Sequence, residues 1–84
     1  MDSALGTIII SLVIMSFFAL SMRGAIKMMG NDFQGAIDDF NKLIDLNPGD
    51  ANAYRNRAEA RRVTGDEKGA KEDLAIADEL KKKE

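Results

Sequence analysis

The chain has 84 residues and can form at most one small globular unit. Its formal net charge is −2, and it contains no Cys and no His. These counts exclude disulfides, thiolate metal sites and histidine-based acid–base catalysis. The near balance of charges gives no support for nucleic-acid binding. We therefore expect no cofactor, no metal site, no enzymatic activity and no nucleic-acid partner.

An uncharged N-terminal segment, Ser3–Met22, predicts a membrane span. Twenty residues in an α-helix rise about 30 Å, which is the thickness of a bilayer's hydrocarbon core. Its large apolar residues would face all sides of the helix, whereas a surface helix would show a polar side. A signal peptide is the main alternative, but no basic residue precedes the segment and Ala19-Leu20-Ser21 is a weak cleavage match. We expect an uncleaved transmembrane anchor over residues 1–22.

Two basic residues, Arg23 and Lys27, follow the predicted span, and none precedes it. Basic residues beside a span favour the cytoplasmic side. We therefore expect an integral, single-pass membrane protein whose C-terminal part faces the cytoplasm, or the stroma or matrix of an organelle. The lipid bilayer is its first predicted partner.

Small or hydroxyl-bearing residues recur along one face of the predicted span, at Ser3, Gly6, Thr7 and Ser11. Small residues allow a second membrane helix to approach closely, so this face is a candidate contact with another subunit. The alternative is that the hydroxyl groups bond only to carbonyls of their own helix.

Three further helices are predicted in the soluble part. Apolar residues at spacings of three and four indicate an amphipathic helix over Asn31–Leu46, with Asp32 as its cap. The turn residues Asn47-Pro48-Gly49-Asp50 end it. The second of these helices covers Ala51–Thr64 and the third runs from Glu67 to about Lys82.

The sequence matches itself at an offset of 34 residues. Identical pairs are Ala19/Ala53, Arg23/Arg57, Asp32/Asp66, Gly35/Gly69, Ala36/Ala70, Asp39/Asp73 and Leu46/Leu80. Conservative pairs are Gly24/Ala58, Lys27/Arg61, Asp38/Glu72, Phe40/Leu74 and Asp45/Glu79. A period of this length belongs to a known class of helical repeat.

The stretch DFQGAIDDFNKLIDLNPGDANAYRNRAEA resembles the tetratricopeptide repeat (TPR). It contains Ala36-x3-Phe40 with Pro48 downstream, and it carries Tyr54 where the family has an aromatic residue. The resemblance implies an all-α fold in which an N-terminal transmembrane helix continues into about 1.5–2 repeats. We place the first repeat at residues 17–50, sharing its first helix with the membrane helix, and the second, with the charged tail, at residues 51–84.

The second repeat departs from the family pattern at Arg57 and Arg61, which stand at normally apolar or aromatic positions, and at Gly69. These departures predict a polar and marginally stable repeat. The acidic residues are predicted to lie on helix surfaces and to form no two-carboxylate site. Gly24 is predicted to let the first two helices pack closely, the alternative being a mere interruption at the membrane surface.

Ile37 and Ile44 of the first repeat correspond to Lys71 and Asp78 of the second. If the two isoleucines pack on a following repeat, the polar pair is suited to an end at which no repeat follows. We therefore expect repeat two to cap the array.

By analogy with the family, the residues that face a partner would be Asn52, Arg55, Asn56, Glu59 and Arg62. Arg and Asn side chains can pair with acidic groups of a neighbouring protein. The alternative is a solvated charged face in which Glu59 and nearby acids neutralise the arginines. Ile76 stands where the first repeat has Lys42, so it is a further candidate contact residue on the solvent side.

Repeat proteins of this class bind partners on a concave helical surface, but stable arrays usually need about three repeats. We therefore expect a non-catalytic, single-pass subunit whose TPR-like domain contacts other protein subunits of a membrane complex. Small one-helix subunits occur in photosynthetic and respiratory complexes, which suggests that setting by class resemblance. The alternative function is a membrane-tethered TPR adaptor or assembly factor that recruits a soluble peptide or chaperone.

Overall fold

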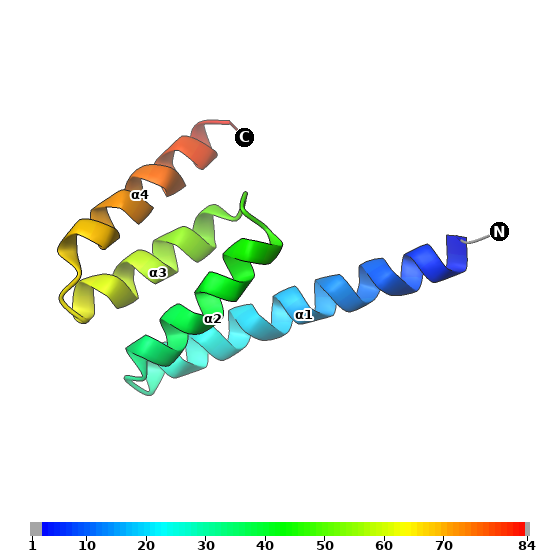
Figure 1. Cartoon of the computed structure of the whole chain (residues 1–84), viewed down its shortest axis with the longest axis horizontal. Coiled ribbons are helices and arrows are strands. Elements are labelled where there is room, and N and C mark those ends of the chain that lie inside the picture. Colours follow the sequence, from blue (N-terminus) through cyan, green and yellow to red (C-terminus); the bar gives the residue numbers. More distant parts are fainter. Residues whose placement is uncertain (1–2, 84) are drawn as a thin grey trace.

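The computed structural model describes residues 3–83, which contain four α-helices and no strand. The helices are α1 (Ser3–Met29), α2 (Phe33–Leu46), α3 (Ala51–Val63) and α4 (Glu67–Lys82). Each helix packs against the next one along the chain. Figure 1 shows this succession of antiparallel hairpins, with the N-terminal half of α1 projecting alone beyond the other three helices. The predicted all-α class is confirmed.

Helix α1 joins the apolar segment to the domain without a break, and no proline interrupts Ser3–Met29. Its C-terminal half belongs to the helical domain, because Phe17, Leu20 and Met28 pack against the core formed with α2 and α3. The large apolar residues nearer the N-terminus, from Leu5 to Met15, are exposed to the surroundings. The described residues contain one helix that is long and apolar enough to cross a membrane, Ala4–Met29.

The same cap begins the second helix of each repeat. The carboxylate of Asp32 accepts a hydrogen bond from the backbone N–H of Gly35, and that of Asp66 accepts one from Gly69. A Cβ at either glycine would clash with the capping carboxylate, so both glycines have a packing reason. Helix α2 begins at Phe33 instead of Asn31, because Asn31 adopts a left-handed φ of 65° in the preceding turn.

The core forms where α1, α2 and α3 meet. Phe40 is its largest fully buried side chain, and its ring lies so close to Gly24 that a Cβ there would fall 2.6 Å from the ring. The predicted close packing of α1 and α2 at Gly24 is therefore confirmed. Ala53 and Tyr54 bring α3 into the same core, whereas α4 contributes the small Ala77.

Equivalent positions of α2 and α4 differ in burial. Ile37 and Ile44 of α2 are buried, whereas Lys71 and Asp78 at the equivalent positions of α4 are exposed.

Candidate functional site

Repeat one contains a carboxylate that is buried between two cations. Asp39 of α2 is 1% exposed, and Arg23 of α1 donates to its two oxygens at 3.1 and 2.7 Å. Lys27, one helical turn after Arg23, approaches the same carboxylate at 3.1 Å. The Arg23 hydrogen bonds lower the pKa of Asp39 to about 2, with Lys27 acting in the same direction and burial opposing both.

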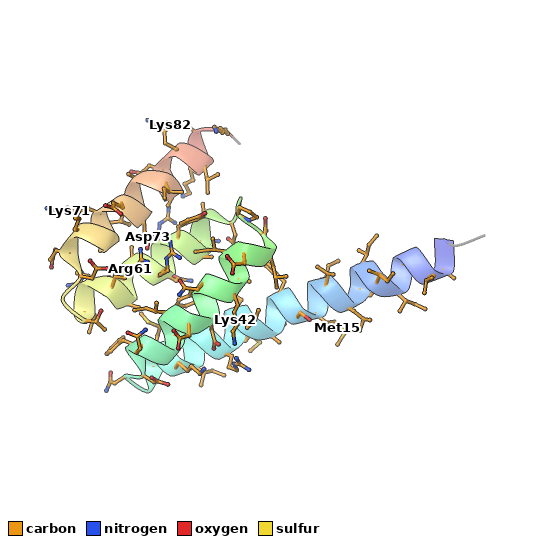
Figure 2. The ribbon with its side chains drawn as sticks, viewed as in Figure 1. Met15, Lys42, Arg61, Lys71, Asp73 and Lys82 are labelled. Atoms are coloured by element: carbon orange, nitrogen blue, oxygen red, sulfur yellow. The ribbon has the colours of Figure 1, made fainter. Side chains whose placement is uncertain are left out.

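Repeat two builds the same cluster from the equivalent residues. Arg57 of α3 donates to Asp73 of α4 at 2.9 and 2.7 Å, and Arg61 donates to the same carboxylate at 2.9 Å. Asp73 is also 1% exposed. Figure 2 shows Arg61 and Asp73 together in the space between α3 and α4. A bidentate guanidinium–carboxylate pair fixes both distance and orientation, so each cluster locks the two helices of its hairpin.

Arg57 also connects the two repeats, since its Nη1 donates to the side-chain oxygen of Asn41 at 2.8 Å. One guanidinium therefore joins α2, α3 and α4. It also lies 5.4 Å from the centre of the Tyr54 ring, within the range of a cation–π contact.

These clusters correct two predictions from the sequence. Asp39 and Asp73 are not surface acids, because each is enclosed by two cations of the facing helix. Arg57 and Arg61 do not simply make repeat two polar, because they neutralise that buried carboxylate. The signal was present in the 34-residue offset, at which the pairs Arg23/Arg57, Lys27/Arg61 and Asp39/Asp73 all recur.

The two buried clusters hold the helices of each hairpin together through paired polar groups. Among the described residues, no buried polar side-chain atom lacks a hydrogen-bond partner. Residues 3–83 also contain no group of three or more metal-ligating side chains that could hold an ion. The candidate functional surface is therefore outside the clusters.

The five predicted contact residues of α3 lie along its surface. Asn52, Asn56, Glu59 and Arg62 are exposed and Arg55 is half-buried. Arg62 donates to Glu59 through two nitrogens, so this pair satisfies part of its own charge, as the solvated-face alternative expects. Both side chains remain more than half exposed and accessible to a partner.

An open groove of about 610 Å³ adjoins the start of this surface. Asn52 lines it together with Phe17 and Ser21 of α1, the turn between α2 and α3, and Lys81 of α4. Ile76 is exposed as expected, but it lies on α4, on a different element from the five α3 residues.

The predicted membrane-helix contacts lie on the projecting part of α1. Thr7 and Ser11 are exposed and Gly6 is half-buried, with nothing within 4 Å of where its Cβ would be. Ser3 begins the helix, and its side chain lies outside the described part of the structure. Whether these four residues contact another helix stays a prediction.

Curated relatives are similar to most of the chain. It is 48% identical over 59 residues to tetratricopeptide repeat protein 36 homolog of Nematostella vectensis, covering 70% of this chain and 33% of that protein. It is 45% identical over 62 residues to tetratricopeptide repeat protein 36 of Homo sapiens, covering 74% and 33%. For the protein of the same name in Danio rerio, the identity is 41% over 58 residues, covering 69% and 31%.

The chain spans about a third of the length of these curated relatives. No family model matches it, and no solved structure matches it. The relatives are named for the tetratricopeptide repeat, which is also the class of repeat that the 34-residue period indicates. The chain therefore belongs to the tetratricopeptide repeat family.

Proposed function

We propose that this chain is a non-catalytic, single-pass membrane subunit whose TPR domain contacts other proteins of a larger membrane complex. The observation that carries the proposal is the continuity of α1, which is an exposed apolar helix at one end and the first TPR helix at the other. TPR domains are protein-binding modules, and a helix of this length and composition is suited to a bilayer.

We expect a rigid junction between the proposed anchor and the domain. Arg23 and Lys27 lie on α1 just after the predicted span, and both bind Asp39 of α2. Gly24 lies between them in sequence and packs against the Phe40 ring. No flexible linker separates the two parts, because α1 is a single helix through Met29. A domain held at a fixed height and angle above the membrane suits a structural subunit, whose neighbours are also fixed.

The α3 surface is the proposed contact for a protein partner. Arg55 and Arg62 offer guanidinium donors, and Asn52 and Asn56 offer amides that can donate and accept. Such a set fits an acidic or carboxylate-bearing surface of the partner. The same two basic residues that flank the span, Arg23 and Lys27, support a domain on the cytoplasmic, stromal or matrix side.

A membrane-tethered adaptor is the second candidate. It is favoured by the polarity of the α3 surface, in which no aromatic or large apolar residue accompanies Asn52, Arg55, Asn56, Glu59 and Arg62. Permanent interfaces are usually more apolar than this, whereas transient ones resemble ordinary protein surface.

Alkaline carbonate extraction of native membranes tests the anchor, and release of the full-length chain into the supernatant would contradict it. Purification in a gentle detergent then separates the two candidates. A subunit should co-purify with constant stoichiometry and resist high salt, whereas an adaptor should lose its partner as salt rises. Changing Arg55, Asn56 and Arg62 together to Ala should weaken either association, and Lys68→Ala with Lys71→Ala on α4 provides the control.

A further inference from the structure

The TPR domain reaches back along the segment predicted to span the membrane. Leu46 at the end of α2 and Asn47 line one apolar pocket of about 350 Å³ together with Val13, Ile14 and Phe17 of α1. Only the part of α1 that is N-terminal to this pocket is therefore free of the domain on all sides.

A length argument shows that the domain and the bilayer compete for the same part of α1. The uncharged segment between Asp2 and Arg23 is Ser3–Met22, about 30 Å of helix. Only its part up to Ser16, about 21 Å, precedes the first residue that packs against the core, Phe17. A hydrocarbon core of about 30 Å is therefore about 9 Å thicker than the free helix is long.

Full insertion of Ser3–Met22 would draw the turn between α2 and α3 into the hydrocarbon. That turn carries the Asn47 amide, the Asp50 carboxylate and backbone groups outside any helix, all of which need polar partners. The headgroup region on each side of a bilayer is about 5–8 Å thick and supplies such partners. This edge of the domain can therefore enter the headgroup region and no further, and the bilayer must thin locally to match the shorter free helix.

The domain edge in question consists of the α2–α3 turn, Leu46–Asp50, and the last turn of α4 with Lys81; we call it the membrane-proximal edge. Figure 1 shows that the α2–α3 turn and the C-terminal end of α4 both lie at the side of the domain from which the N-terminal half of α1 projects. Lys81 lines the same groove as Phe17 and Ser21 of α1. Leu46 is 49% exposed at this edge, beside the apolar surface of α1.

We propose that the membrane-proximal edge is embedded in the phospholipid headgroup layer, so that this edge of the domain contacts lipid headgroups. This inference rests on the proposed membrane anchor. The occupant is a phospholipid bilayer because the apolar surface of α1 continues directly onto Leu46. Lys81, with Lys82 and Lys83 following it, adds a basic group that anionic lipids attract. The opposite edge, at the α3–α4 turn, is held away from the membrane.

The experiment uses single cysteines in the full-length chain, which has none of its own. Leu46→Cys probes the membrane-proximal edge, and Val63→Cys is its matched control, because Val63 is 46% exposed at the end of α3 near the opposite edge. Ile10→Cys probes the projecting part of α1. Each variant carries an environment-sensitive fluorophore and is reconstituted in phosphatidylcholine–phosphatidylglycerol vesicles that contain a spin label either on the headgroup or deep in the acyl chain.

We expect the label at position 46 to lose most of its fluorescence to the headgroup quencher, the label at position 10 to the acyl-chain quencher, and the label at position 63 to neither. If position 10 is quenched but position 46 behaves like position 63, the anchor stands and the embedded edge is wrong. If position 10 is not quenched by the acyl-chain label, the membrane anchor itself is wrong and the inference falls with it.

Discussion

The two repeats use one ionic design with different amounts of apolar support. Each places a buried aspartate of its second helix between two cations of its first, at the same sequence separations. Repeat one adds Phe40, Leu43 and Ile44 as buried apolar side chains of α2. In repeat two the equivalents are Leu74, which is exposed, the small Ala77, and Asp78.

The clusters also differ in how far water reaches them. The side chain of Arg57 is 14% exposed because Asn41 of the preceding repeat covers it, whereas that of Arg23 is 56% exposed. Repeat two therefore depends more on its ionic cluster, and repeat one depends more on apolar packing against α1. The same ionic motif is therefore expected to contribute different amounts to stability in the two repeats, because different residues pack around it.

Removing α1 is the largest expected effect, because repeat one is built on it. A fragment of residues 31–84 loses Arg23 and Lys27, leaves Asp39 without its cations and uncovers Phe40. We expect weak helical circular dichroism and no cooperative melt from this fragment, and a cooperative melt from residues 17–84, which retain the C-terminal half of α1. A sharp transition from the shorter fragment would show that repeat one stands without the membrane helix.

The contribution of apolar packing to the stability of each repeat is tested at equivalent positions of α2 and α4. Phe40→Ala empties the centre of the core and should destabilise the full-length chain by about 3–5 kcal/mol. Leu74→Ala, 34 residues later, removes a side chain that is 44% exposed and should cost less than about 1 kcal/mol. Denaturant unfolding in detergent micelles, followed by circular dichroism, measures both, and equal losses would refute the proposed division of roles.

The ionic half is tested with Asp73→Asn and its counterpart Asp39→Asn. Asp73→Asn leaves two guanidinium groups uncompensated in a largely enclosed site and should cost about 3 kcal/mol or more. Asp39→Asn should cost less, because the half-exposed Arg23 can turn to water. Asp78→Asn on the exposed face of α4 is the control, with an expected change within about 0.5 kcal/mol. The reverse order of the two buried variants would contradict the comparison.

Much of this fold was predictable from the sequence, and the reason lies in periodicity. The four helices, the 34-residue repeat, the Asp32 cap and the close packing at Gly24 all follow from local patterns. The burial of Asp39 and Asp73 does not follow from local patterns, because an aspartate on a helix is expected to be solvated when its position is considered alone. Recognising it required pairing each aspartate with the two cations of the other helix, which is a tertiary relation.

Acid should weaken repeat one through a defined group. The Asp39 pKa is about 2 in the folded chain, below its ordinary value of 3.8. A lowered pKa means that this carboxylate stabilises the fold fully above about pH 4 and loses its contribution as the pH falls towards 2. The difference in thermal stability between the natural chain and Asp39→Asn should therefore shrink between pH 4 and pH 2. A difference that stays constant across this window would show that the Asp39 charge contributes nothing.

The smallest expected effect on stability is at the α3 surface, which makes that surface the cleanest place to test partner binding. Arg62 pairs with Glu59 one turn away, and both side chains are more than half exposed. Exposed pairs of this kind contribute little to stability because water screens them, so Arg62→Ala should leave the melting curve almost unchanged. Any loss of co-purifying protein from that variant then reports a lost contact instead of a weakened fold. Arg57→Ala would lose both together, since that guanidinium joins three helices, and it therefore cannot separate binding from stability.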